Sequence, residues 1–126
     1  MTQINTYINI IDNSGIKLVK CLGNPYKKKS IKIEIGDSFL GSIKKLRPKY
    51  KINKLKKGDL VHCLLIQNKI QRKNSNNVLY TFFNNYAIIL NEQRLPMGTR
   101  IFCSILAEPF RIKKLYRILI LAKKVI

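Results

Sequence analysis

One segment of the chain carries basic side chains at a density suited to binding phosphate. Between Lys44 and Lys57, eight of the fourteen residues are Lys or Arg and none is acidic. Lysine ammonium groups and the planar guanidinium of Arg47 pair well with phosphate oxygens, and Tyr50 adds a flat face on which a base or sugar can stack. The segment therefore predicts a contact surface for a polyanion, with nucleic acid as the first partner to consider.

The charge of the whole chain points to the same kind of partner. The sequence holds 25 Lys and Arg against 6 Asp and Glu, so a net charge of +19 on 126 residues would repel itself unless a polyanion neutralised it. Further clusters at Lys27–Lys29 and Lys123–Lys124 spread this charge, which favours contact with folded RNA over reading of a single groove. The predicted RNA-binding residues are Lys27, Lys28, Lys29, Lys44, Lys45, Arg47, Lys49, Tyr50, Lys51, Lys54, Lys56, Lys57, Arg72 and Lys73.

Catalytic and metal-binding chemistry finds little support in the residue types. Cys21, Cys63 and Cys103 lie far apart with no Cys-x-x-Cys pair, so we expect reduced thiols that act as small hydrophobic side chains, and no metal site or cofactor. The single histidine, His62, does not define a Ser-His-Asp triad, and no phosphate-binding glycine loop or nucleophile elbow is present in the sequence. We therefore expect that the protein is not an enzyme.

Half of the acidic residues have a structural explanation. Asp12, Asp37 and Asp59 stand at glycine-bearing turns, where a short carboxylate accepts backbone N–H groups. Three glycines at the predicted turns are expected to adopt backbone angles that a side chain would penalise. These glycines are Gly15, Gly58 and Gly98.

The elements that position these residues are predicted to be mainly β-strands. Short runs rich in β-branched and aromatic residues alternate with a period of two and are separated by Gly, Asn, Asp or Pro. So many short strands in a small chain favour a closed β-barrel of about five core strands, because closure removes exposed edges. The predicted strands are Ile8–Ile11, Ile16–Leu22, Ile31–Ile35, Ser38–Lys45, Leu60–Asn68, Val78–Phe83, Tyr86–Leu90 and Thr99–Phe102.

Two segments depart from the strand pattern. Lys69–Asn77 is polar and basic, and is predicted to form the tip of a projecting β-hairpin. In about residues 104–122, apolar side chains recur at helical spacing among basic ones, which predicts one or two short helices packed on the barrel, separated at Pro109. A membrane-surface helix has the same pattern, but the apolar run Ile118–Ala122 is short, so no membrane insertion is expected. Residues 1–126 are predicted to form one domain.

Four turn sequences then occur in an order and spacing that resemble a known family. They are Asp12-Asn13-Ser14-Gly15, Lys56-Lys57-Gly58-Asp59, Phe83-Asn84-Asn85-Tyr86-Ala87 and Pro96-Met97-Gly98-Thr99-Arg100-Ile101-Phe102. The set resembles large-subunit ribosomal protein fourteen, in its bacterial or organellar form, over the whole chain. The chain departs from the family's pattern at Asn84 and Tyr86, at Cys103-Ser104 where Gly-Pro is usual, and at Ala107-Glu108-Pro109-Phe110.

The resemblance implies a structural protein of the large ribosomal subunit. Proteins of this family bind large-subunit ribosomal RNA, lie beside the third and nineteenth proteins of that subunit, and reach small-subunit ribosomal RNA at intersubunit bridges. A ribosome-silencing factor docks on the same surface, where Thr99 and Arg100 match the family's Thr-Arg. The alternative is a non-ribosomal, basic single-strand-binding barrel, which would present an exposed row of aromatic side chains.

The predicted compartment follows from the start of the chain and its composition. No signal or transit peptide is expected before the first strand, the chain is rich in Ile, Lys and Asn as A/T-rich coding would produce, and the family's motifs are eroded. Together these features favour a protein encoded and used in a mitochondrion. The bacterial cytoplasm and a plastid-like organelle are the alternatives.

Overall fold

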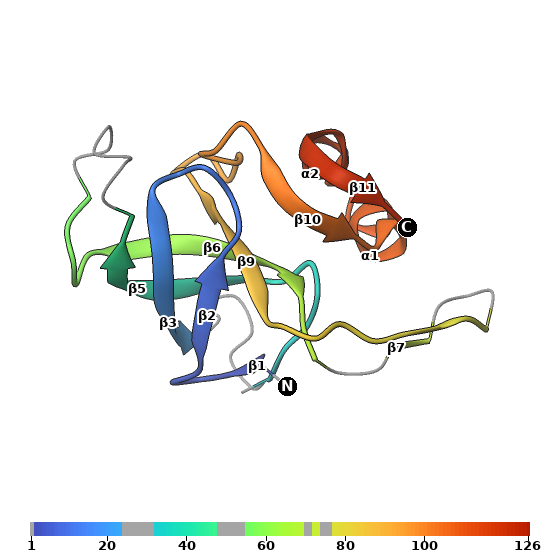
Figure 1. Ribbon diagram of the computed structural model, residues 1–126, viewed down its shortest axis with the longest axis horizontal. Helices are drawn as coiled ribbons and strands as arrows, with labels where there is room; N and C mark the ends of the chain where they lie inside the picture. The colour runs from blue at the N-terminus through green and yellow to red at the C-terminus, as the bar shows by residue number, and fades with distance from the viewer. Residues whose placement is uncertain (1, 24–31, 48–54, 70–71, 74–76) are drawn as a thin grey trace.

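A closed barrel of five strands, in the order β2-β3-β5-β6-β9, lies at the centre of the computed structural model (Figure 1). The structure describes residues 2–23, 32–47, 55–69, 72–73 and 77–126. The predicted mainly-β barrel is confirmed. The strands of the barrel are β2 (Tyr7–Ile10), β3 (Ile16–Gly23), β5 (Ser38–Leu46), β6 (Leu60–Gln67) and β9 (Tyr86–Leu90).

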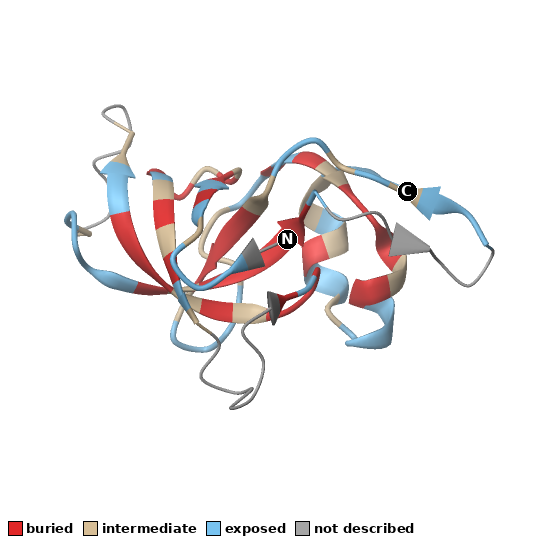
Figure 2. Cartoon of the chain, turned by 90° about the horizontal axis from the view of Figure 1, so that it is seen from below, coloured by how far each residue is buried: buried red, intermediate tan, exposed pale blue. Residues whose placement is uncertain are grey.

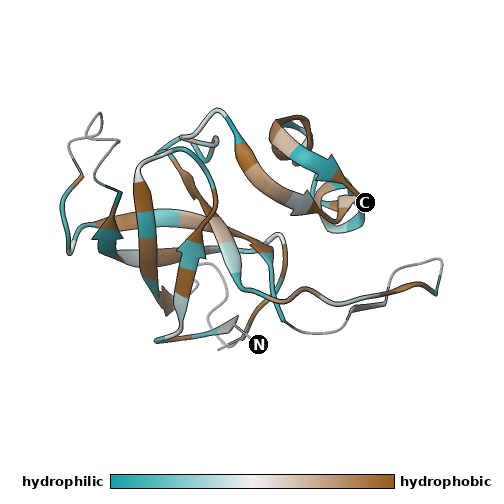
Figure 3. Ribbon diagram, viewed as in Figure 1, coloured by the Kyte–Doolittle hydropathy of each residue, from teal (hydrophilic) through white to brown (hydrophobic). Residues whose placement is uncertain are grey.

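The period-two pattern of the sequence places one side of each strand inside the barrel, because successive side chains of a strand point to opposite faces. In β2, Ile8 and Ile10 are buried while Tyr7 and Asn9 are exposed. Figure 3 shows the same alternation of brown and teal along β2 and β3. Four antiparallel pairings link the strands in turn, and a parallel pairing of β2 with β9 closes the barrel.

The buried residues, which are red in Figure 2, form two cores. The first fills the barrel and includes Ile8, Phe39 and Ile43. The second lies on the outer face of β6 and β9, where Leu64 and Ile88 pack with residues from the C-terminal part of the chain. This second core explains why β6 is buried continuously from Cys63 to Gln67 instead of alternating.

The C-terminal unit consists of β10 (Ile101–Ile105), α1 (Ala107–Ile112), α2 (Tyr116–Leu121) and β11 (Ala122–Val125). The two short helices agree with the expectation from the sequence, but β10 extends to Ile105, so the helical part begins at Ala107. The strand β11 was not predicted; it runs parallel to β10. The sequence did not reveal where α2 ends and β11 begins, because apolar residues continue the helical spacing up to Ala122.

The prediction that Pro109 separates the helices is wrong. Pro109 lies within the first turn of α1, where the backbone N–H that proline lacks would have no intrahelical partner in any case. The helices separate instead around Lys114, whose φ of 57° is incompatible with a continuous right-handed helix. The outer face of this unit is basic as expected, since Lys114, Arg117 and Lys123 are exposed.

Two short strand pairs complete the described structure. The first, β1 (Thr2–Gln3) with β4 (Lys32–Ile33), includes a strand that the sequence did not reveal, and β4 is shorter than the predicted Ile31–Ile35. The second, β7 (Arg72–Lys73) with β8 (Leu79–Tyr80), forms the predicted hairpin, which extends away from the barrel in Figure 1. Residues 70–71 and 74–76 of its predicted tip lie outside the described residues.

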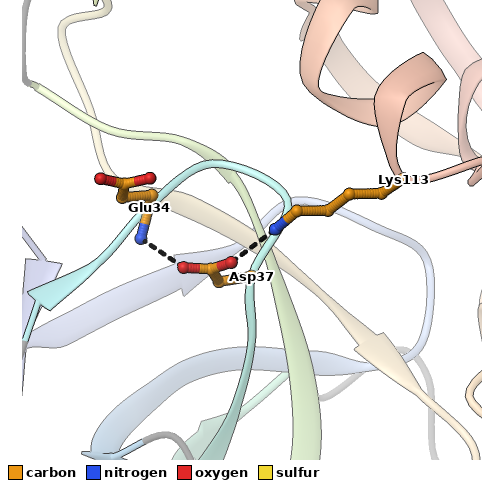
Figure 4. A network of polar contacts seen from close by, with 3 residues as sticks. All are labelled: Glu34, Asp37 and Lys113. Atoms are coloured by element: carbon orange, nitrogen blue, oxygen red, sulfur yellow. Dashed lines mark hydrogen bonds and ion pairs between the residues drawn. The ribbon is translucent and has the colours of Figure 1, made fainter. Parts of the chain in front are cut away.

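An ion pair ties the C-terminal unit to the barrel (Figure 4). Asp37, only 4% exposed, lies in the turn before β5; its Oδ1 accepts a hydrogen bond from Lys113 Nζ at 2.5 Å, and its Oδ2 accepts the backbone N–H of Glu34 at 3.1 Å. The stem of Lys113 also lies against Gly36. Lys113 is therefore a structural residue, although it belongs to the basic side chains around the helices.

Candidate nucleic-acid interface

Four exposed lysines gather at one end of the barrel. Lys44 and Lys45 stand near the end of β5, and Lys56 and Lys57 occupy the turn that leads into β6. Backbone hydrogen bonds hold the two segments together, from Gly58 N–H to the Ile43 carbonyl at 2.8 Å and from Ile43 N–H to the Asp59 carbonyl at 3.0 Å. We call Lys44, Lys45, Lys56 and Lys57 the barrel-end cluster; it lies at the left of Figure 1, opposite the hairpin.

The turn within the barrel-end cluster uses its single acid for its own backbone. Asp59 Oδ2 accepts the N–H of Lys56 at 2.9 Å, and Gly58 adopts a φ of 89°, which glycine tolerates without strain. Both predictions for this turn are confirmed. In the part of the chain that the structure describes, none of the four lysines forms an ion pair, so their charge is available to a partner.

Arg47 differs from these lysines because it is partly committed to the fold. Its Nη2 donates a hydrogen bond to the carbonyl of Ile10 at 3.1 Å, its backbone N–H donates to Gly15, and its side chain is half-buried. A guanidinium has five N–H donors in a planar fork, so this bond is compatible with an additional phosphate contact. Contact of Arg47 with RNA stays a prediction.

The remaining predicted residues divide into two groups. Arg72 and Lys73 form β7 in the projecting hairpin, away from the barrel-end cluster, so the structure does not bring the two sets together (Figure 1). The other predicted positions lie outside the described residues; these are Lys27, Lys28, Lys29, Lys49, Tyr50, Lys51 and Lys54.

The predicted partner residues Thr99 and Arg100 are exposed in the turn before β10, and the sequence did not reveal what holds them there. Asn13, in the turn between β2 and β3, accepts the N–H of Thr99 at 2.7 Å and the N–H of Arg100 at 3.2 Å on its Oδ1. Its Nδ2 donates to Thr99 Oγ1 at 2.7 Å. Asn13 was recognised only as part of a turn motif, because its partners lie 86 and 87 residues along the chain.

Gly98 permits this contact by its lack of a side chain. The prediction that Gly98 adopts an unusual backbone angle is wrong, since the positive-φ glycines are others, Gly15 among them. A Cβ on Gly98 would lie 2.6 Å from Asn13 Oδ1 and 3.2 Å from Asp12 Cβ, distances shorter than van der Waals contact. The glycine is therefore required for close approach of the two turns.

Asp12 stabilises the turn between β2 and β3, in which Asn13 also lies. Its Oδ1 accepts the N–H of Ser14 at 3.1 Å and the Ser14 hydroxyl at 2.5 Å, and its Oδ2 accepts the N–H of Ile89 in β9 at 3.0 Å. Burial raises the pKa of the Asp12 carboxyl above 3.8, and these hydrogen bonds together with the charge of Arg47 oppose the increase. The expected structural role of Asp12 is confirmed, as it is for Asp37.

The three cysteines are separate, buried side chains. Cys21, Cys63 and Cys103 are free and buried, as expected; burial raises the pKa of the Cys63 thiol and raises the pKa of Cys103 to about 12. Thiols held in this protonated form are weak nucleophiles. Among the described residues, no group of three or more His, Cys, Asp or Glu converges to hold a metal ion. No helix in that part of the chain has the length and apolar character to cross a membrane.

Comparison with known proteins agrees with this arrangement. Residues 1–126 match the family described as ribosomal protein L14p/L23e. The chain is 43% identical over 110 residues to the large ribosomal subunit protein uL14c of Eimeria tenella. The aligned region covers 83% of this chain and 84% of that relative. A five-stranded barrel with a basic surface and a match along its entire length leads to one conclusion. The chain belongs to the ribosomal protein L14p/L23e family.

Proposed function

We propose that this protein binds large-subunit ribosomal RNA through the barrel-end cluster and the projecting hairpin, as a structural constituent of the large ribosomal subunit. The observation that carries this proposal is a difference between the acidic and the basic side chains in what they contact. Asp12, Asp37 and Asp59 turn their carboxylates to the protein's own turns, while the four lysines of the barrel-end cluster are exposed. The positive potential of that end is therefore directed to an external anion.

Sedimentation tests this function directly. A core constituent remains with the large subunit after a high-salt wash, whereas a transient RNA-binding protein is released, because its electrostatic contacts weaken with salt. We expect the native protein to stay with the large subunit. Its complete release by the wash would favour the alternative, a non-ribosomal RNA-binding barrel. Among the described residues, the exposed aromatic side chains Tyr7, Phe83, Phe102 and Tyr116 come from separate segments, which does not favour that alternative.

The isolated protein should bind structured RNA with a strong dependence on salt. If the basic surface neutralises about six phosphates, the logarithm of affinity should fall against the logarithm of salt concentration with a slope of roughly −4 to −5. Titration of a labelled ribosomal RNA fragment at several salt concentrations measures this slope. An affinity that hardly changes between low and moderate salt would contradict a phosphate-dominated contact.

The barrel-end cluster should contribute to RNA binding without stabilising the fold. In a Lys56→Gln/Lys57→Gln variant, the salt slope should become shallower by about 2, because about one counterion is released for each phosphate contact. The free energy of unfolding should change by less than about 0.5 kcal/mol, since the removed groups are exposed. A matched Lys123→Gln/Lys124→Gln variant, with the same charge change on β11, should bind RNA more tightly than the first variant. Equal losses in both variants would mean that the barrel-end cluster has no special part in RNA binding.

We also propose that the Gly98–Arg100 turn faces the small subunit. Thr99 and Arg100 match the family's Thr-Arg at the intersubunit surface and are exposed here, which supports this placement. Neighbourhood with the third and nineteenth large-subunit proteins, contact with small-subunit ribosomal RNA and docking of a silencing factor follow from the same resemblance and are part of this proposal.

Arg100→Ala should reduce the affinity of large subunits for small subunits while leaving incorporation of the protein into large subunits unchanged. Arg100 is exposed and supplies a guanidinium suited to an interface, so its loss affects a partner contact and not the core. Light scattering of subunit association and quantification of the protein in purified large subunits measure the two effects. Loss of incorporation with normal association would place Arg100 against large-subunit RNA instead.

We place the protein in an organellar ribosome. The similar protein from Eimeria tenella is of the plastid type, which supports an organelle and favours the plastid alternative. The mitochondrion expected from the sequence stays a prediction. Detection of the protein in ribosomes from separately purified plastids and mitochondria distinguishes the two compartments, and its presence only in bacterial or cytosolic ribosomes would contradict both.

A further inference from the structure

We infer that Asn13 is the positioning residue that holds Thr99 and Arg100 in the conformation presented to the small subunit. The inference rests on the proposed docking role of the Gly98–Arg100 turn and adds a residue that lies outside that turn. It follows from the way in which one side chain bonds two consecutive amides of a turn that is far away in the sequence.

The side-chain amide of Asn13 completes the hydrogen bonding of the docking turn. Thr99 and Arg100 precede β10, which begins at Ile101, so their amides do not belong to that strand's ladder. Asn13 Oδ1 accepts both N–H groups, at 2.7 and 3.2 Å, and thus fixes two consecutive peptide units. The third bond, from Asn13 Nδ2 to Thr99 Oγ1 at 2.7 Å, also fixes the rotamer of the Thr99 side chain.

The base from which Asn13 acts is rigid. Asp12, 1% exposed, is bonded to Ser14 and to Ile89 in β9, and pairs with Ile101 in an antiparallel bridge. The N–H of Phe102 donates to the Ile11 carbonyl at 3.0 Å, which fixes the chain just after the docking turn. Gly98 fixes its approach just before that turn, because a Cβ there would collide with Asn13.

This arrangement has a chemical consequence for recognition. Because Thr99 Oγ1 accepts a hydrogen bond from Asn13, its hydroxyl hydrogen is directed to other acceptors. The exposed turn then offers a hydroxyl donor from Thr99 and guanidinium donors from Arg100, a combination suited to a phosphate oxygen of small-subunit RNA. Ordering the turn in advance lowers the conformational entropy lost on docking.

The test compares Asn13→Ala with Asn13→Asp in the full chain. Alanine removes all three bonds, whereas aspartate keeps an acceptor for both amides and lets the Thr99 hydroxyl donate to it. By NMR, we expect the amides of Thr99 and Arg100 to exchange with solvent about tenfold faster or more in Asn13→Ala, with near-normal rates in Asn13→Asp and unchanged rates in β6 and β9. Large subunits reconstituted with Asn13→Ala should join small subunits several-fold more weakly, and Asn13→Asp should restore part of this loss.

The Arg100→Ala variant separates failure of this inference from failure of the proposed function. Exchange rates at Thr99 and Arg100 that do not change in Asn13→Ala overturn the positioning role, whatever happens to subunit joining. Faster exchange with normal joining also overturns it, provided that Arg100→Ala weakens joining. If Arg100→Ala leaves joining unchanged as well, the docking role of the turn is wrong, and the inference built on it falls for that reason.

Discussion

Replacement of Phe110 by alanine should lower the free energy of unfolding by about 3–5 kcal/mol, the range found when a large aromatic side chain is removed from a packed core. Phe110 is fully buried in α1 and belongs to the second core, between the barrel's outer face and the C-terminal unit. Since native proteins are stable by only about 5–15 kcal/mol, the change is a large part of the stability of the fold. Urea unfolding followed by circular dichroism measures it.

Ile112 provides the matched control for this substitution. It lies in the same helix, two residues further on, and is 71% exposed, so Ile112→Ala should change stability by less than about 0.5 kcal/mol. The contrast isolates burial from helix propensity, because alanine favours the helix at both positions. A loss below about 1 kcal/mol for Phe110→Ala would mean that the C-terminal unit adds little to the stability of the barrel.

The sequence predicted those parts of the fold whose residues alternate over several positions. β2, β3, β5, β6 and β9 all have apolar side chains at a period of two or in continuous buried runs, and each was placed within a few residues. Short elements carry too few residues to show a period, which is why β1 was missed. β11 was missed for a different reason, since parallel pairing with β10 overrides a local pattern that continues α2.

Turn chemistry was predictable where it is local and not where it is long-range. Asp59 and Gly58 serve their own turn, so their roles follow from neighbouring residues. Gly98 and Asn13 depend on each other across the fold, and no local pattern distinguishes a glycine needed for close approach from one needed for its backbone angle. The same limit applies to Lys113, whose partner Asp37 is 76 residues away.

The candidate interface also combines features that follow from neighbouring residues with features that depend on long-range contacts. High local density of Lys and Arg was sufficient to predict an exposed basic surface, because such a surface needs charge and little geometry. Which residues are committed to the fold is decided by tertiary contacts. Arg47 shows this most clearly, because its bond to the Ile10 carbonyl depends on the pairing of β5 with β3, which brings Arg47 beside the turn between β2 and β3.

The second large effect is expected at Asp12, where stability should depend on both its hydrogen bonds and its charge. Asp12→Ala removes the acceptor of the Ile89 N–H, which is buried, and of both Ser14 donors, so the free energy of unfolding should fall by about 2–4 kcal/mol.

Because burial raises the pKa of Asp12 in the folded protein, its proton is bound more tightly there than in the unfolded chain. The stability that Asp12 contributes is thus greatest below its unfolded pKa of 3.8 and decreases as pH rises through the folded pKa. Urea unfolding of wild type and Asp12→Ala at a series of pH values measures the difference between their free energies of unfolding. This difference should decrease from acid to neutral pH. The other carboxylates are the same in both proteins, so their contributions cancel in the difference. A difference that instead widens with pH would mean that hydrogen bonding to Ser14 and Ile89, and not burial, dominates the charge state of this side chain.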